Sequence, residues 1–283
     1  LKSSLTEGFS LNTHFVVFVI LANINHKLFK MKKIIFFSTL LFISLKAVAQ
    51  VEPGSTLRYH FFKVDKAVMP EYETVMKDWF QKVQQARVDN GCIKAWVFRK
   101  IVPGPSNHSS EYTHMAIDVL MPGEEGTDIL KCDVDYAELF PDLSEGMIEI
   151  MQKIMNNKER MYRARLQYVA GGGDLQPYAI YNLTKTKNRS KYINKHEEYS
   201  QTFTKYSDRG AWHSLQRMDP EGYAQWNWDY VTVDAYPSAL IARKNVNRVP
   251  KNIRDKMLKK YGTGPEQRTI RERFVGLLIA KAN

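Results

Sequence analysis

Two stretches of this chain share one pattern and decide its fold: "RVDNGCIKAWVFRK" (Arg87–Lys100) and "YSDRGAWHSLQRM" (Tyr206–Met218). Each closes a helix-like segment, turns at a glycine and continues into an aromatic-rich strand. A glycine is common just after the last turn of a helix, because it adopts a positive φ without strain. The two glycines, Gly91 and Gly210, lie 119 residues apart, and this spacing predicts a duplicated unit.

The residues around the first stretch predict an ordered set of elements. A strand at 57–64 precedes a helix at about 70–90, and strands at 93–101 and 112–120 follow. Apolar residues recur along the helix at steps of three and four, which is the pattern of one buried face. They are Tyr72, Val75, Met76, Trp79, Phe80 and Val83.

The second unit repeats this order, with a strand at 178–185, a helix at 191–208 and strands at 211–218 and 226–236. A further helix and a fourth strand follow in each unit. The fourth strands share the spacing R-x-x-R-x-R, and the two copies of it are 108 residues apart. Its arginines are Arg160, Arg163 and Arg165 in the first unit and Arg268, Arg271 and Arg273 in the second.

The boundary between the units is a glycine-rich stretch that ends in proline. We expect residues 171–177 to form a linker between a first repeat at 50–170 and a second repeat at 178–283. The alternative is a phosphate-binding glycine loop, but the stretch lacks the Lys-Ser/Thr ending of such loops.

The order β-α-β-β-α-β is that of a ferredoxin-like repeat, and it occurs here twice in tandem. One such repeat leaves a face of its four-stranded antiparallel sheet without helices, and a bare apolar face needs a partner. We therefore expect an α+β fold in which the two repeats pack sheet to sheet as a fused α+β barrel. Since both repeats belong to one chain, we expect a monomer.

This arrangement resembles the dimeric α+β barrel superfamily, which includes antibiotic-biosynthesis-monooxygenase-like and NIPSNAP-like proteins. The resemblance covers nearly all of the chain after residue 49, but in architecture only. It implies that interior His, Tyr, Trp and Asp side chains could handle protons without a cofactor. It carries over no particular catalytic residue.

The N-terminal region predicts export. After the first methionine, Met31, two lysines precede an apolar run of 12 residues, Ile34–Leu45, and a small-x-small cleavage site. This is the pattern of a signal peptide at 31–49, because the run is shorter than a membrane span requires; a membrane anchor is the alternative. Residues 1–30 are expected to lie upstream of the true start. We expect a periplasmic or secreted chain that begins at Gln50 and has no membrane association after cleavage.

The charge of the expected mature chain is modest. The sequence carries a net charge of +11, and removal of residues 1–49 takes away six lysines and one glutamate, which leaves +6. Basic and acidic residues are interleaved, so we expect no nucleic-acid-binding surface. The two cysteines, Cys92 and Cys132, could form a disulfide in an exported protein or remain free. No metal-ligand spacing is present, and we expect neither a metal nor a cofactor.

Alternation along the third strands selects the candidate catalytic residues. Successive side chains of a strand point to opposite faces of the sheet. We expect the purely apolar face of 112–120 to pack under the helices, and the face with His114 and Asp118 to line the interior between the sheets. Tyr230 and Asp234 hold equivalent positions in the second unit. These four residues could hold and move protons, or they could be structural.

Further residues expected at the interior would suit an anionic or aromatic ligand, because they are arginines and aromatic side chains. They are His60, Trp96, Arg163, Arg165, Trp228, Arg271 and Arg273. Buried charges need partners, so salt bridges between these arginines and the two aspartates are the structural alternative. The tryptophans could equally be core residues.

Three functions remain open from the sequence. The first is an exported protein that binds a small aromatic or anionic ligand between the two sheets. The second is a cofactor-independent enzyme, monooxygenase-like or isomerase-like, that uses interior His, Tyr and Asp residues. The third is a structural or stress-related protein with a filled interior. An open cavity with arginines favours binding, and one with a histidine hydrogen-bonded to an aspartate favours catalysis.

Overall fold

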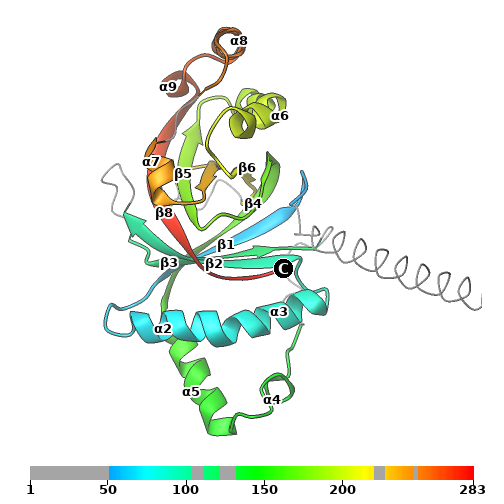
Figure 1. The fold of residues 1–283 in the computed structure, drawn as a ribbon, viewed down its shortest axis with the longest axis vertical. Helices are drawn as coiled ribbons and strands as arrows, with labels where there is room; N and C mark the ends of the chain where they lie inside the picture. The colour runs from blue at the N-terminus through cyan, green and yellow to red at the C-terminus, as the bar shows by residue number, and fades with distance from the viewer. Residues whose placement is uncertain (1–50, 104–110, 122–131, 220–226, 245–247) are drawn as a thin grey trace, which may run out of the picture. The chain divides into compact units, whose positions relative to one another are not determined.

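The computed structural model describes residues 51–103, 111–121, 132–219, 227–244 and 248–283. The expected upstream segment at 1–30 and the expected signal peptide at 31–49 lie outside the described residues. Residues 49–283 form one compact unit, and everything below concerns this unit (Figure 1).

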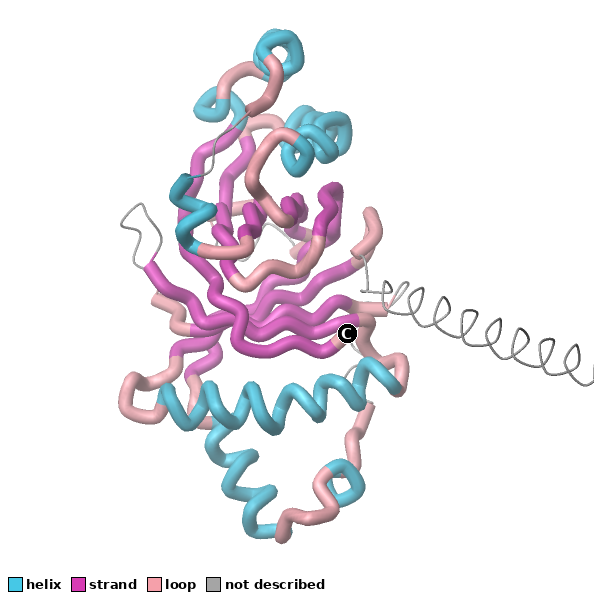
Figure 2. The backbone as a smooth tube through the Cα atoms, in the orientation of Figure 1, coloured by secondary structure: helices cyan, strands magenta, loops and turns pink. Residues whose placement is uncertain are grey.

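Eight described strands form a closed antiparallel barrel in the order β1-β3-β2-β8-β5-β7-β6-β4. The strands are β1 (Thr56–Lys63), β2 (Ala95–Pro103), β3 (His114–Val119), β4 (Glu159–Gly173), β5 (Tyr178–Thr186), β6 (Ala211–Arg217), β7 (Tyr230–Tyr236) and β8 (Arg268–Ala282). The helices lie outside the barrel (Figures 1 and 2). They are α2 (Met69–Val75), the π-helical turn η1 (Met76–Phe80), α3 (Gln81–Asp89), α4 (Tyr136–Leu139), α5 (Glu145–Asn156), α6 (Arg189–Lys205), α7 (Ala239–Lys244), α8 (Lys251–Tyr261) and α9 (Gly264–Gln267).

The expected packing of two separate sheets face to face is wrong. Strands β1 to β4 pair with one another, as do β5 to β8, but β4 also pairs with β6 and β8 also pairs with β2. Both β4 and β8 are 15 residues long, so each extends past its own half and pairs with a strand of the other. Unpaired strand edges are costly, and these two junctions remove them by closing a single barrel.

The barrel interior is a single apolar core to which all eight strands contribute. Its members include Leu57, Tyr59, Phe61, Ala95, Met115, Ile117, Val119, Leu166, Tyr181, Leu183, Leu215, Val231, Val233 and Phe274. A second apolar cluster lies between the barrel and α2, η1, α3 and α5, and a third lies beneath α6. Strand β3 is buried along its whole length because it is covered on both faces.

The helix expected at 70–90 forms as α2, η1 and α3 in direct succession. Pro70 lies in its first turn, where its missing N–H costs nothing, and Gly91 follows its end with a φ of 70°. The expected apolar face is largely confirmed, since Tyr72, Val75 and Val83 are buried. The adjacent Cys92 forms a disulfide with Cys132, which resolves the alternative that the sequence left open.

The glycines expected to begin a linker are the last three residues of β4. Gly171 to Gly173 pair with β6 at one of the two junctions between the halves. Gly171 and Gly173 have φ values of 148° and 93°, and a Cβ on Gly173 would overlap the backbone of Gly210 and Ala211. Gly172 has open space around it. Gly171 and Gly173 are therefore required by the close approach of two strands, whereas Gly172 is not.

We predict that Gly173→Ala lowers the free energy of unfolding by about 2 kcal/mol or more, because a positive φ and a backbone overlap both oppose a side chain there. Gly172→Ala is the matched control and should change it by less than about 1 kcal/mol. Urea unfolding followed by circular dichroism measures both. Equal effects of the two substitutions would contradict this account of the junction.

Candidate functional site

A cavity of about 460 Å³ lies on the outside of the barrel, between β1 and the helix formed by α2, η1 and α3. Small-molecule sites usually measure about 300–1,000 Å³. We call this cavity the outer pocket. It is lined by Arg58, His60, Phe62, Tyr72, Met76, Phe80, Gln84, Arg87, Trp96, Ala116, Asp118, Asp133, Lys158, Arg160 and Arg163.

Strand register brings the polar wall of the outer pocket together. On β1, Arg58 and His60 share the outer face, because they are two residues apart. Arg58 lies opposite Asp118 of β3, and His60 lies opposite Arg163 of β4. Three strands thus place two cations, an imidazole and a carboxylate side by side.

The helix supplies the facing wall. Met76, Phe80, Gln84 and Arg87 follow one another at steps of three and four residues and all line the pocket. Met76 and Phe80 are the first and last residues of the π-helical turn. Such turns are uncommon and are often found at functional sites.

Asp118 is the centre of the polar wall. Its Oδ2 lies 2.9 Å from His60 Nε2 and 3.1 Å from Arg58 Nη2. Burial alone would raise the pKa of Asp118, but His60 and Arg58 together hold it below its usual value. Asp118 is therefore a carboxylate at neutral pH, and Arg58 balances its charge.

His60 is neutral under the same conditions. Burial lowers the pKa of its imidazole, and Asp118 opposes the shift only in part. A neutral imidazole carries one N–H, and the Asp118 carboxylate fixes that proton on Nε2. The buried Nδ1 then holds a lone pair and has no hydrogen-bond partner among the described residues.

The remaining cations of the outer pocket are not balanced by carboxylates. Among the described residues, no carboxylate lies within 4 Å of a side-chain nitrogen of Arg87, Lys158, Arg160 or Arg163. Lys158 lies over the rings of Phe62 and Tyr72. Burial and the nearby Arg160 lower the pKa of Lys158 to about 8. The pocket therefore combines aromatic walls with excess positive charge.

The corresponding residues of the second half form a different cluster. By register, Asn182 corresponds to His60, and Asp234 corresponds to Asp118. Asp234 pairs with Arg209 at 2.7 Å and accepts a hydrogen bond from Asn182. Arg273 lies opposite Asn182 and donates to it. Asp234 is thus held in a salt bridge, but with Arg209 rather than with one of the arginines that the sequence suggested.

His114 and Asp118 do not face the barrel interior. The apolar side chains of β3 belong to the interior core, and the face with His114 and Asp118 lies outside, under the helix. The expected assignment of faces is therefore reversed. The reason is that an eight-stranded barrel has a narrow interior that side chains from every strand must fill, whereas the outer face meets a helix that can leave a pocket.

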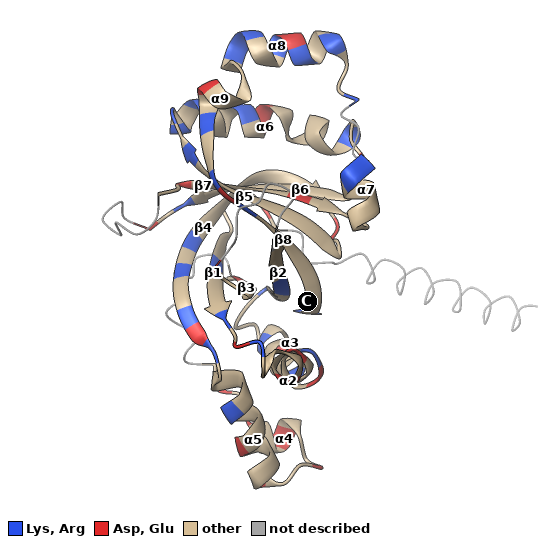
Figure 3. Ribbon diagram, turned by 90° about the vertical axis from the view of Figure 1, so that its left-hand side faces the viewer, with Lys and Arg blue, Asp and Glu red and all other residues tan. Residues whose placement is uncertain are grey.

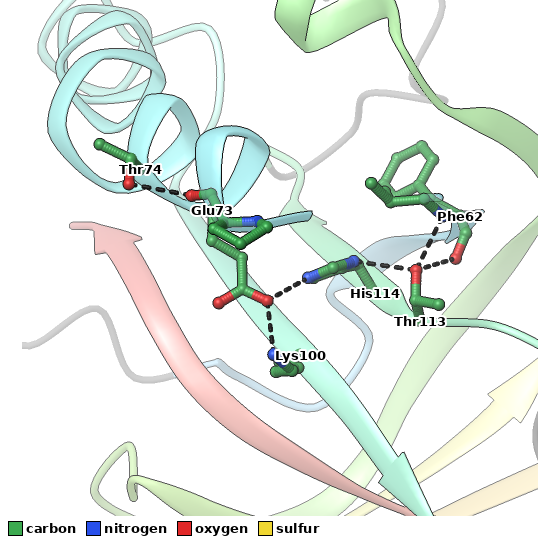
Figure 4. Close-up of polar contacts among 8 residues, drawn as sticks. Phe62, Glu73, Thr74, Lys100, Thr113 and His114 are labelled. Carbon is green, nitrogen blue, oxygen red and sulfur yellow. Dashed lines mark hydrogen bonds and ion pairs between the residues drawn. The ribbon is translucent and has the colours of Figure 1, made fainter. Parts of the chain in front are cut away.

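His114 belongs to a separate polar cluster beside the outer pocket (Figure 4). Its Nε2 lies 3.2 Å from Glu73 Oε1, and its Nδ1 lies 3.0 Å from Thr113 Oγ1. Lys100 Nζ lies 2.7 Å from the same Glu73 oxygen. His114 is fully buried, so this cluster holds α2 on the barrel without contacting a cavity.

The other expected site residues are dispersed. Tyr230 is buried beneath α6, where its hydroxyl contacts His196 and Ser214. Trp228 is part of the interior core, 5.1 Å from the Arg217 guanidinium. Arg271 is exposed on β8. Of the expected residues, the outer pocket contains His60, Trp96, Asp118 and Arg163, whereas Arg165 does not line it.

Sequence reasoning did not select Arg58, Arg87, Lys158 or Arg160 as site residues. Arg58 could have been found by applying alternation to "LRYHFFKV" as it was applied to the third strands. The arginine spacing was also misaligned by two residues. The register of β1 with β4 and of β5 with β8 places Arg163 opposite His60 and Arg273 opposite Asn182, which makes the equivalent arginines 110 residues apart.

The described residues contain neither a membrane-spanning helix nor a cluster of metal ligands. None of their helices is long and apolar enough to cross a membrane. Within the same residues, no group of three or more His, Cys, Asp or Glu side chains is arranged to hold a metal ion.

No protein-family model and no curated protein matches this sequence. Solved structures that match over most of their length include a "putative monooxygenase" from Fusobacterium nucleatum, with 10% identity, a TM-score of 0.46 and coverage of 82% of this chain and 95% of that one. A heme-binding protein from Thermus thermophilus has 10% identity, a TM-score of 0.44 and coverage of 80% and 92%. A chlorite dismutase mutant from Candidatus Nitrospira defluvii has 10% identity, a TM-score of 0.40 and coverage of 80% and 92%. These similarities assign no activity to this chain.

We predict that the His114 imidazole titrates below its ordinary pKa of about 6.5, because burial disfavours its charged form. Glu73→Gln should lower this pKa further, and Lys100→Gln should raise it, since the two charges act in opposite directions. NMR titration of the imidazole resonances measures all three.

The same shift predicts the direction of a stability change. A histidine whose folded pKa lies below its unfolded pKa contributes fully above about pH 6.5, and its contribution is lost as the pH falls through the folded value. The free energy of unfolding should therefore decrease on acidification. A His114 pKa above 6.5 would contradict both expectations.

Proposed function

We propose that this protein binds a small organic anion with a flat aromatic or apolar part in the outer pocket. The observation that carries the proposal is the combination of aromatic walls with five cations and two carboxylates around one cavity. Phe62, Tyr72, Phe80 and Trp96 provide apolar surface for a planar ligand. Because Asp118 is already paired with Arg58, the other cations can meet an acidic group of the ligand.

The geometry also supports an order of recognition. Arg160 and Arg163 are exposed on β4, so they can meet an anion as it enters the pocket. Lys158 lies deeper, against the rings of Phe62 and Tyr72. A bound anion would raise the lowered pKa of Lys158 and so favour its charged form. His60 Nδ1 can accept a hydrogen bond from a ligand hydroxyl or a bridging water.

The proposed binding site lies outside the barrel, whereas the sequence analysis expected it in the interior between the two sheets. The proposal retains the expected ligand class and, with export, the expected compartment. The disulfide between Cys92 and Cys132 supports export, because disulfides persist in oxidising compartments.

A second candidate is a cofactor-independent, isomerase-like enzyme that moves a proton of the bound ligand. His60 and Asp118 favour it: a neutral histidine, oriented by a carboxylate and with a free lone pair, has the form of a general base. The cations would stabilise the negative charge that forms when a C–H proton leaves the ligand.

We predict that 3-phenylpropanoate binds at least about tenfold more tightly than its neutral amide, and that Arg163→Gln removes about tenfold of this affinity, as expected for a hydrogen bond to a charged group. Arg254→Gln on α8 removes the same charge outside the pocket and should leave the affinity unchanged. Isothermal titration calorimetry measures both. Equal affinity for acid and amide would overturn the proposal.

A second experiment, with wild type and His60→Gln, distinguishes a binding protein from an enzyme. Phenylpyruvate is anionic and aromatic and has acidic methylene protons, and NMR in D2O follows their exchange. If the protein is an enzyme of this kind, wild type accelerates the exchange and His60→Gln does not, although it still binds 3-phenylpropanoate. If it is a binding protein, neither accelerates it. Native mass spectrometry of the exported protein would show a co-purifying ligand and a chain that begins at Gln50.

A further inference from the structure

A second, smaller cavity lies inside one end of the barrel. It measures about 100 Å³, which is the volume of roughly three waters. Most of its lining is aliphatic, from strands of both halves. Its polar lining consists of Tyr59, Arg99, Tyr168, Gln176, Tyr181 and His213.

Arg99 is the unusual member of this lining. It is only 2% exposed, and no carboxylate of the described residues lies within 4 Å of its guanidinium. Its Nη atoms donate to the backbone oxygens of Gln176 and Gly276, at 2.9 and 3.0 Å. These carbonyls satisfy part of the guanidinium but supply no negative charge, and an unbalanced buried cation costs several kcal/mol.

A glycine beside Arg99 leaves space for its side chain. A Cβ on Gly276 of β8 would lie 2.9 Å from both Arg99 Cδ and Tyr181 Cε2, so the side chain reaches the cavity because a glycine faces it. The corresponding residue of the second half is Leu215, judged by the partners of Arg99 on β3 and of Leu215 on β7. The cavity therefore has an arginine from the first half only.

Two tyrosines complete the cavity. Tyr59 and Tyr181 occupy corresponding positions on β1 and β5, and their rings meet edge to face at 6.3 Å. Both are buried, and neither hydroxyl makes a hydrogen bond with a described residue. Burial raises the pKa of both, so both hydroxyls remain protonated and can donate.

His213 adds no competing charge. Burial lowers the pKa of His213 to about 4, and Arg99 acts in the same direction. Its Nδ1 lies 3.2 Å from the Tyr168 hydroxyl. The cavity therefore presents one buried cation and hydroxyl donors, with no anion of its own.

We propose that this interior cavity binds a compact monoanion, such as a short-chain carboxylate or nitrate, against Arg99 with Tyr59 and Tyr181 as additional donors. The site is distinct from the outer pocket and does not depend on the function proposed for it. The aliphatic lining suits the methyl or methylene groups of a short carboxylate.

The test follows the imidazole resonances of His213 during titration with acetate, propionate, nitrate and sulfate. Wild type should show a saturable shift with the three monoanions and not with the larger dianion. The Tyr59→Phe/Tyr181→Phe variant should bind the three monoanions at least about tenfold more weakly than wild type does. It keeps every contact that Arg99 makes to the backbone, so it separates binding from folding. Tyr136→Phe on α4 is the control and should behave as wild type.

Arg99→Gln should abolish the shift, and thermal unfolding shows whether this variant still folds. Arg163→Gln in the outer pocket should leave the shift unchanged, which separates the two sites. No saturable shift in wild type, or equal shifts in wild type and the double tyrosine variant, would overturn the proposal.

Two helical connections on the surface of the barrel differ in charge. The connections from β3 to β4 and from β7 to β8 occupy corresponding places in the two halves but carry opposite charge. We call residues 132–158 the acidic end, and residues 239–244 and 248–262 the basic end. The acidic end has six carboxylates and two lysines, and the basic end has eight cations and one carboxylate. The excess positive charge of the chain after residue 49 therefore resides in the basic end.

Both ends also expose apolar side chains. Met147 and Ile150 of α5 are 46% and 53% exposed, and Leu240 of α7 and Leu258 of α8 are 60% and 45% exposed. Most charges of the two ends are unpaired: among the described residues, no opposite charge lies within 4 Å of Glu145, Glu149, Arg254, Lys256 or Lys259. Charged residues around exposed apolar ones are typical of a docking surface.

The two ends lie on opposite sides of the barrel (Figures 1 and 3), so they cannot pair within one chain. We infer that the acidic end of one copy binds the basic end of a second copy. Complementary charge selects this partner, since each surface is matched by the other in sign and in exposed apolar residues. The expectation of a monomer considered only the sheet faces. Such contacts form either a reciprocal dimer or a head-to-tail chain.

Sedimentation velocity of wild type should show association that weakens with added salt. Glu145→Lys/Glu149→Lys leaves the acidic end with four carboxylates and four lysines, so that it has no net charge. Lys256→Glu/Lys259→Glu lowers the net charge of the basic end from +7 to +3. Each variant alone should associate at least about tenfold more weakly. An equimolar mixture of the two should associate again, because each variant then offers the surface that the other lacks. A monomeric wild type at low salt, a mixture that stays monomeric, or binding of anionic vesicles by monomers through the basic end would overturn the inference.

Discussion

The hydrogen bonds between β4 and β6 and between β2 and β8 are the constraint on which the rest of the structure depends. A half built from four strands would end in two open edges with unpaired backbone groups. The extra length of β4 and β8 carries each strand past its own half to the edge of the other. The glycines at the end of β4 allow one of these junctions to close without steric conflict.

Closure decides where binding can occur. The eight described strands enclose a space that Leu, Val, Ile and aromatic side chains largely fill, and it contains the small cavity beside Arg99. A larger ligand must therefore be bound outside the barrel, where a helix spans the strands. On the first half, this layer leaves the outer pocket, and the strand faces that line it can carry charge because the helix does not cover them completely.

The two halves share an order of strands but differ in chemistry. Where the first half has His60, Arg58 and Asp118, the second has Asn182, Ile180 and Asp234. The first cluster lines a cavity, whereas the second is closed by Arg209 and Arg273. The charges of the helical connections have also diverged in sign. The two halves thus share one barrel, but only the polar cluster of the first half lines the outer pocket.

The sequence alone determined the order of strands and helices and the helix at 70–90. It also determined which polar residues share one face of a strand. These features depend on local periodicity. The sequence also selected Asp118, His60, Trp96 and Arg163, which the outer pocket contains. Only the tertiary structure decided that the sheets join into one barrel and that the apolar face of β3 points inward. Cross-strand register placed Arg163 opposite His60 and Arg273 opposite Asn182, and it joined Arg58 to Asp118. These features depend on contacts between residues far apart in the chain, which local patterns do not encode.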